Sequence, residues 1–203
     1  MADLGRLLDT ELIRNAGPLW DEATTSPFLE AVARGDVSPP AFGRWLSQDY
    51  LFASELTAFQ AVAVSKVPRA CHKPLIGGLA ALDSELAWFE SHAERLQLAL
   101  RGPAHPTCRR YTDFLLHSAH TDRYPLLLGI LFAVEASYLA AWSALAAEGP
   151  YRQFIERWSS EAFKDYVLSL RRLAEDNPDP AQQGAFDRVL DFERDFRRRS
   201  GIG

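Results

Sequence analysis

The 203-residue sequence lacks several features that mark particular classes of protein. It has only two cysteines, Cys71 and Cys108, and neither belongs to a closely spaced pair or lies beside a histidine on an inward face. We therefore expect reduced thiols, with neither a disulfide framework nor a nucleophilic cysteine. No basic segment followed by an apolar run opens the chain, so we expect no signal peptide and a cytoplasmic location. No Gly- or Ser-rich linker and no internal repeat divides it, which predicts one domain over residues 1–203.

The sequence also lacks an excess of basic residues. Its 22 Lys and Arg are outnumbered by 27 Asp and Glu, which gives a formal net charge of −5 and a pI near 5.6. Nucleic-acid binders usually carry a basic face, so we expect no nucleic-acid partner. The tight basic cluster at 197–199 is interpreted as a solvated helix end, where cations are favourable.

One apolar segment, Tyr124 to Ala147, is long enough to span a bilayer. Glu135 lies at its middle, where a charge would cost about 2.5–3.5 kcal/mol on insertion. There is no second segment of this kind. We therefore interpret the segment as the central helix of a bundle, buried nearly all round, and expect no membrane partner.

Apolar residues recur with a period near 3.6 along almost the whole chain, and no convincing period-2 strand is present. Short connections favour antiparallel neighbours, so the predicted fold is an all-α, single-domain helical bundle. Ser38 and Pro39-Pro40 predict the start of one helix, Gly35 predicts the end of another, and Pro27 could kink that earlier helix. The predicted helices cover residues 2–16, 19–34, 40–65, 74–100, 106–119, 124–148, 151–174 and 181–199.

Asp49 lies on an apolar helix face, four residues after Trp45 and three after Leu46. An unpaired ionised carboxylate buried there would cost roughly several kcal/mol, so it must be hydrogen-bonded, paired or in contact with a ligand. The same spacing places Glu85, Glu135 and Glu193 on inward faces of three other helices. Several converging acids predict a built site with separated pKa values. Alternatively each acid is structural, and Glu85 in particular could pair with an arginine.

Inward carboxylates also raise the possibility of a di-metal site, which typically needs Glu-x-x-His on two helices. No histidine follows a glutamate at that spacing, and Asp113 and His117 share a face away from the apolar stripe. We therefore expect neither a metal nor another cofactor. Aromatic residues crowd the same faces as the acids, and a ring-walled pocket with an acidic end suits a flat, nitrogen-rich ring. These aromatics are Phe52, Trp88, Tyr111, Tyr138, Trp142 and Trp158.

In five stretches, taken in order, the chain resembles the TenA-type thiaminase II family, which has a haem-oxygenase-like all-α fold. Together they cover nearly the whole chain. The stretches are WLSQDYLF at 45–52, HPTCRRYTDFL at 105–115, LLLGILFAVEASYLAAW at 126–142, FIERWSSEAF at 154–163 and DFERDF at 191–196.

The resemblance implies roles for individual residues. Asp49 corresponds to the acid that holds the amino group and ring nitrogen of an aminopyrimidine, and Glu193 to a catalytic glutamate. Trp158 stands where many members have a tyrosine that stacks on the ring. The expected substrate contacts are Asp49, Phe52, Glu85, Tyr111, Tyr138 and Trp158, and the expected catalytic residues are Asp49, Glu135 and Glu193.

Glu135 departs from the members that cleave thiamin, because those members place a nucleophilic cysteine in this part of the helix. The branch with glutamate implies hydrolysis of thiamin breakdown products: deformylation of formylaminomethyl-aminopyrimidine or deamination of aminomethyl-aminopyrimidine. Glu135 would activate a water or protonate the leaving nitrogen, with Glu193 as proton partner. Two alternatives remain open, a non-catalytic small-molecule binder and a metal-dependent oxygenase on the same fold. Long helices with spare apolar faces predict a homodimer or homotetramer.

Overall fold

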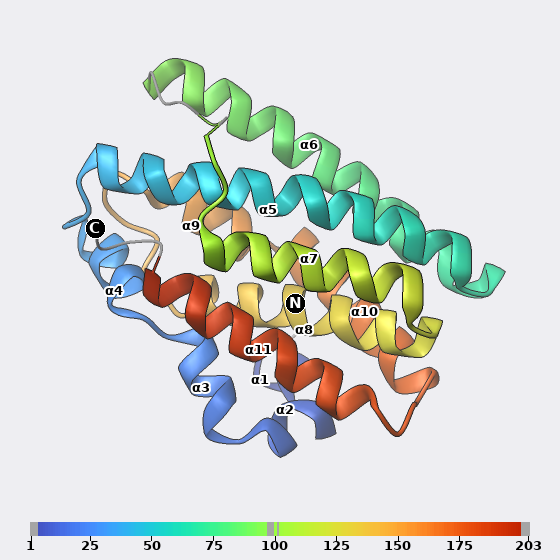
Figure 1. The fold of residues 1–203 in the computed structure, drawn as a ribbon. Helices are drawn as coiled ribbons and strands as arrows, with labels where there is room; N and C mark the ends of the chain where they lie inside the picture. Colours follow the sequence, from blue (N-terminus) through green and yellow to red (C-terminus); the bar gives the residue numbers. More distant parts are fainter. Residues whose placement is uncertain (1–3, 97–99, 101, 200–203) are drawn as a thin grey trace.

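The computed structural model of the chain describes residues 4–96, 100 and 102–199, and within them all regular structure is helical. Figure 1 shows the helices packed into one bundle, which confirms the predicted all-α class. In chain order they are α1 (Leu4–Leu8), α2 (Glu11–Ala16), α3 (Pro18–Thr24), α4 (Pro27–Arg34), α5 (Pro39–Lys66), the 3₁₀ turn η1 (Arg69–Cys71), α6 (His72–Leu96), α7 (Pro106–Thr121), α8 (Tyr124–Ser143), α9 (Arg152–Trp158), α10 (Glu161–Asp176) and α11 (Gln182–Arg199).

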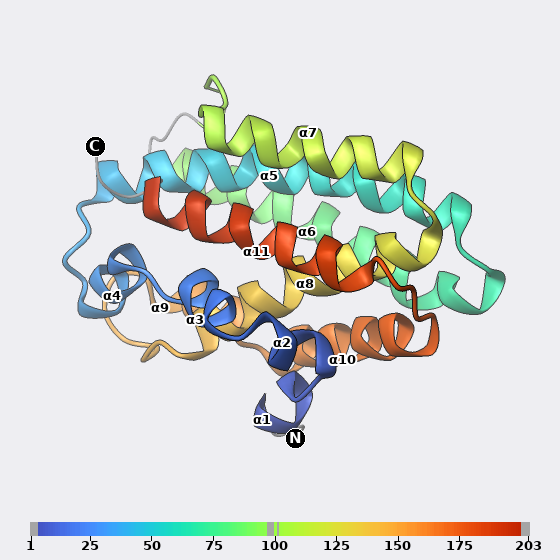
Figure 2. The same cartoon turned by 60° about the horizontal axis from the view of Figure 1, so that its bottom comes forward.

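Two long helices organise the bundle. Helix α5 packs against both α6 and α7, and α8 packs chiefly against α11 and α10 (Figures 1 and 2). The short helices α3 and α9 also contact α8. Acids carried by α5, α6 and α8 therefore point toward a common interior.

Helix α8 is the core helix. Its residues from Leu127 to Ser137 are all buried, and 78% of its most apolar window lies inside the bundle. By length and composition it is the one helix among the described residues that could cross a membrane. Its burial on all sides explains its lack of amphipathic pattern, because every face meets apolar neighbours.

Four predicted helix boundaries are wrong, and capping residues explain three of them. The described part of the predicted 2–16 helix divides before Thr10, and the predicted 19–34 helix divides before Ser26. Each of these hydroxyls accepts a hydrogen bond from the backbone N–H three residues later, at 3.2 Å, and so starts a new helix. Pro27 is accordingly the first residue of α4 and not a kink. The predicted start at residues 2 and 3 lies outside the described residues.

The predicted 151–174 helix divides in the same way. Helix α9 ends at Trp158 and α10 begins at Glu161, with the Ser160 hydroxyl accepting a hydrogen bond from Phe163 N at 3.3 Å. The fourth error is at the end of α8, which stops at Ser143 and not at residue 148. Residues 97–99 of the predicted 74–100 helix lie outside the described residues.

Other boundaries are confirmed. The Ser38 hydroxyl caps α5 by accepting from Ala41 N at 3.4 Å, with Pro39 in the first turn. Gly35 ends α4 in the left-handed conformation at φ 73°, which favours glycine.

Candidate functional site

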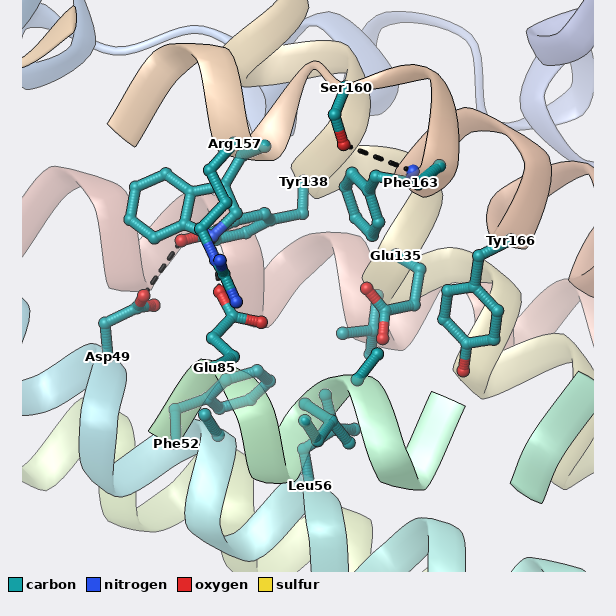
Figure 3. A pocket seen from close by; sticks show the side chains of 16 residues that line it. Asp49, Phe52, Leu56, Glu85, Glu135, Tyr138, Arg157, Ser160, Phe163 and Tyr166 are labelled. Carbon is teal, nitrogen blue, oxygen red and sulfur yellow. Dashed lines mark hydrogen bonds between the residues drawn. The ribbon is translucent and has the colours of Figure 1, made fainter. Parts of the chain in front are cut away.

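A cavity of about 270 Å³ lies between α5, α6, α8 and the α9–α10 segment. Three of the four predicted inward acids line it: Asp49 from α5, Glu85 from α6 and Glu135 from α8. Figure 3 shows their carboxyl groups directed into the same space. The sequence prediction that acids from separate helices converge on one pocket is therefore met by these three residues.

Asp49 has a hydrogen-bonding partner across the cavity. Its carboxylate accepts from the Tyr138 hydroxyl at 2.8 Å (Figure 3), and the residue is 4% exposed. Burial raises the pKa of Asp49 well above its usual value, the Tyr138 hydrogen bond opposes this, and the nearby charges of Glu85 and Glu193 add to it. The Asp49–Tyr138 pair thus presents both a hydrogen-bond acceptor and a hydroxyl group to the cavity.

Glu135 has no hydrogen-bond partner within the part of the chain that the structure describes, although it is only 7% exposed. Burial raises its pKa to about 8, and the charges of Glu85, Glu193 and Asp49 contribute to this rise. A carboxyl group in this state exchanges protons near neutral pH. It can contact a bound molecule, because no donor from the described residues holds it.

Glu85 is fixed by an indole instead of an arginine. Its carboxylate accepts a short hydrogen bond from Trp158 Nε1. Burial raises the pKa of Glu85, while the Trp158 hydrogen bond and the Arg157 charge lower it. Arg157 itself lies over the Trp88 ring, 4.7 Å from the ring centroid. The alternative expectation was that Glu85 pairs with an arginine. In the structure Arg157 affects Glu85 only through its charge, and the hydrogen bond comes from Trp158.

Glu193 and Tyr111 lie in an adjoining compartment. Both line a much smaller cavity, of about 10 Å³, which shares Asp49, Phe52 and Tyr138 with the larger one. The Tyr111 hydroxyl donates to Glu193 Oε1 at 2.7 Å, and Arg197 Nη2 lies 2.9 Å from Glu193 Oε2. Glu193 therefore shares the smaller cavity with Asp49 and does not line the larger cavity that Glu135 enters.

Arg197 corrects one prediction from the sequence. The basic cluster at 197–199 was expected to be a solvated helix end, but Arg197 is 4% exposed and paired with the buried Glu193. The acid four residues earlier on the same inward face of α11 explains its burial. Arg198, in contrast, is mostly exposed and lies near Glu22.

The predicted aromatic walls are present. Phe52, Tyr138 and Trp158 line the larger cavity. The Trp158 ring lies edge-on to Tyr138, with centroids 5.3 Å apart and planes at 83°. Trp142 also contacts Trp158, with ring centroids 4.4 Å apart. Trp88 does not line either cavity and instead packs on Phe154 and His92.

One lining residue that was not predicted, Arg157, lies in the last turn of α9. Three others were not predicted either: Ser160, Phe163 and Tyr166, which follow the helix break after Trp158. The signal that could have found them is Ser160, which was readable as an N-cap and would have placed Phe163 and Tyr166 on one face, three residues apart.

The described residues contain no group of three or more His, Cys, Asp or Glu side chains placed to hold a metal ion. Both cysteines are buried and unpaired with each other. Cys108 Sγ donates to the Gln48 carbonyl at 3.6 Å, and burial raises its pKa to about 12, so it is not a thiolate near neutral pH. The chemistry available in the larger cavity is that of carboxyl groups, hydroxyls, aromatic rings and the Arg157 guanidinium group.

The sequence model of the TENA/THI-4/PQQC family matches residues 13–200. A probable bifunctional TENA-E protein from Glycine max is 26% identical over 168 residues, which cover 77% of this chain and 73% of that protein. The solved structure of a TenA homologue from Pyrococcus furiosus is 25% identical, with a TM-score of 0.86 over 92% of this chain and 96% of that one. A domain from Shewanella denitrificans with a heme oxygenase-like fold gives a TM-score of 0.68 at 12% identity, over 97% and 89% of the two chains. This last likeness shows the shared fold and confirms the expected haem-oxygenase-like architecture.

Proposed function

Because this chain belongs to the TENA/THI-4/PQQC family, we propose that it is a hydrolase of thiamin salvage that acts on an aminopyrimidine, with Glu135 as its acid–base group. The observation that carries the proposal is the Glu135 carboxyl group, which is buried, lacks a protein hydrogen-bond partner among the described residues, and enters the same cavity as Asp49. The family relationship supports the reaction class, and the cavity chemistry supports the substrate class.

Asp49 and Tyr138 would orient the aminopyrimidine. The Asp49 carboxylate can accept from the exocyclic amino group, while Phe52 and Trp158 supply apolar walls for the ring faces. Holding the ring in this way fixes the reacting atom close to Glu135. This proximity lowers the entropic part of the activation barrier for attack by water. Glu193, fixed by Tyr111 and Arg197, supports the Asp49 end of the site from the smaller cavity.

Glu135 would then carry the proton transfers. For a formylaminomethyl substituent, the Glu135 carboxylate takes a proton from water as the water oxygen bonds to the formyl carbon. The resulting carboxylic acid gives that proton to the amide nitrogen as the C–N bond breaks, and the products are formate and the aminomethyl-pyrimidine. For an aminomethyl substituent, water replaces the amino group and ammonia leaves. A pKa of about 8 suits both the base and the acid form of this group.

The substrate screen uses the purified full chain with thiamin, aminomethyl-aminopyrimidine and formylaminomethyl-aminopyrimidine, followed by product identification by mass spectrometry. We expect turnover of at least one of the two breakdown products and no cleavage of thiamin, because residue 135 is not a cysteine. If neither breakdown product is converted while both bind, the protein is a binder and the proposed activity is wrong. Cleavage of thiamin would overturn the assignment of the reaction.

A further inference from the structure

Tyr166 of α10 closes the end of the larger cavity that lies away from Asp49. Figure 3 shows Asp49 and Tyr166 on opposite sides of the cavity, with Glu135 between them. Glu135 and Tyr166 line the same part of the cavity (Figure 3), and the charge of Glu135 adds to the rise in the pKa of Tyr166 that burial mainly causes. A molecule that contacts Asp49 with one end and Glu135 with its reacting atom therefore directs its remaining atoms at Tyr166.

The phenol of Tyr166 is held in place by a chain of hydrogen bonds. Its hydroxyl donates to Gln60 Oε1 at 3.2 Å, and Gln60 Nε2 donates to the Leu75 carbonyl at 2.7 Å. Gln60 is fully buried, at 0% exposure. Because the amide is anchored on the backbone of α6, the Tyr166 ring has a fixed position relative to the cavity.

Gly78 makes this arrangement possible. A Cβ atom at this position would overlap both the Tyr166 hydroxyl oxygen and the Gln60 amide nitrogen. The helix surface of α6 is therefore hollow at the point where the phenol and the amide meet. A side chain here would displace Tyr166 from its present position.

We propose that Tyr166, held by Gln60 in the hollow left by Gly78, is the specificity-determining residue that limits the size of the group removed from the substrate. This inference deepens the proposed function and rests on it: with the pyrimidine at Asp49 and the reacting atom at Glu135, the phenol stands where the departing group would extend. The cavity of about 270 Å³ is small by comparison with the roughly 300–1,000 Å³ of typical ligand pockets. A longer acyl chain would have to overlap the ring of Tyr166, which its hydrogen bonds keep from moving aside.

The test measures kcat/KM of the parent protein, Tyr166→Ala and Tyr166→Phe for aminomethyl-aminopyrimidine carrying formyl, acetyl or propionyl groups. We expect the parent to prefer formyl to propionyl by at least tenfold and Tyr166→Ala to lose at least tenfold of that preference, mainly through KM. Tyr166→Phe keeps the ring and should keep most of the preference. Tyr124→Ala removes a tyrosine outside the cavity and should leave the ratio unchanged.

Calorimetric binding of the same three compounds separates this inference from the proposed activity. If the parent binds them without turnover, the hydrolase assignment fails, and the dependence of Kd on acyl length still decides the role of Tyr166. A folded Tyr166→Ala variant that keeps the parent's preference, in both kcat/KM and Kd, overturns the inference. Equal Kd values for the three compounds in the parent would overturn it as well.

Discussion

Glu135 and Glu193 are both buried glutamates, but their surroundings give them different chemical states. Glu193 accepts a hydrogen bond from Tyr111 and pairs with Arg197, so two groups oppose the rise in its pKa that burial causes. Glu135 has neither kind of partner in the described part of the chain, and three other acids raise its pKa further. Glu135 is therefore the better-suited proton donor and acceptor, and Glu193 the better-suited fixed anion.

We expect Glu135→Gln to reduce kcat by about 10²–10⁴, because the amide has the shape of the acid but cannot transfer protons. Affinity for the pyrimidine should change little, since Asp49 and the aromatic walls remain. Steady-state kinetics with the best substrate from the screen, together with calorimetric titration of the product pyrimidine, measures both quantities. Wild-type turnover in this variant would show that another group carries the proton.

The raised pKa of Glu135 also predicts that the stability of the parent depends on pH and that Glu135→Gln removes this dependence. A glutamate has a pKa of 4.5 in the unfolded chain and Glu135 has about 8 when folded, so between these values the folded protein holds a proton that the unfolded chain has lost. The free energy of unfolding of the parent therefore falls as pH rises through this window. Glu135→Gln lacks this effect and should gain up to a few kcal/mol relative to the parent between pH 5 and 8. Urea denaturation at both pH values measures this difference, which would stay constant if Glu135 were ionised throughout.

The residue-scale predictions from sequence succeeded where helical spacing alone decides direction. Asp49 follows Trp45 by four residues and therefore lies on the same inward helix face, whichever helix packs against it. Its burial could for this reason be predicted. Spacing does not say which helices face each other, and so it could not separate the compartment of Glu193 from that of Glu135. The sequence analysis also predicted that Arg197 is exposed to solvent. A charged residue on an inward face can be recognised as paired only once its partner, here Glu193, is known.

At the scale of the helix, the break between α9 and α10 is the feature that builds one wall of the site. Trp158 is the last residue of α9, and Phe163 lies in the first turn of α10. The short segment between them turns the chain so that side chains from both helices enter the cavity (Figure 3). A continuous helix over 151–174 would instead spread these residues around its circumference.

Ser160→Ala should lower the free energy of unfolding by about 1 kcal/mol, because it removes the hydroxyl that caps α10. Ligand affinity should fall as well, since Phe163 and Tyr166 depend on the position of this first turn. Ser38→Ala removes a similar cap from α5, which starts away from the cavity, and should lower stability without weakening binding. Urea denaturation and calorimetric titration of both variants make the comparison. Equal losses of affinity in the two variants would contradict the assigned role of the break.

The sequence predicted where helices exist better than where they divide. Long apolar periodicity marked α5, α7 and α11 with small errors at their ends, and it placed the start but not the end of α8. The breaks at Thr10, Ser26 and Ser160 interrupt an apolar pattern that continues on both sides, and a serine or threonine within such a pattern fits a helix interior as well as a cap. Tertiary packing decides between these uses, because it determines which direction of the chain buries more apolar surface.

At the scale of the whole molecule, a pocket enclosed by α5, α6, α8, α9 and α10 couples ligand binding to the stability of the bundle. A pyrimidine at about 100 times its Kd should add about 2.7 kcal/mol to the free energy of unfolding. For a chain of this size, that corresponds to a rise in Tm of about 5–11 °C. Differential scanning fluorimetry of the parent and Asp49→Asn measures the effect, and the variant should lose most of it. An undiminished rise in the variant would remove Asp49 from the binding site.

The overall fold was more accessible from sequence than the site, because a mostly helical pattern with short connections leaves few arrangements for a single core. The long apolar segment could be assigned to the centre of the bundle from the charge at its middle. What could not be predicted was the neighbour on each side of every helix, and the cavity depends on that arrangement.

The burial of α8 has a consequence for biosynthesis. Its main neighbours, α10 and α11, follow it in the chain, so this twenty-residue apolar helix leaves the ribosome before its two principal packing partners have been made. Until α11 has emerged, the apolar face of α8 that it covers stays exposed, and transiently exposed apolar surface of this kind promotes aggregation. We therefore expect premature termination within α11 to leave α8 partly uncovered and to lower the yield of folded protein.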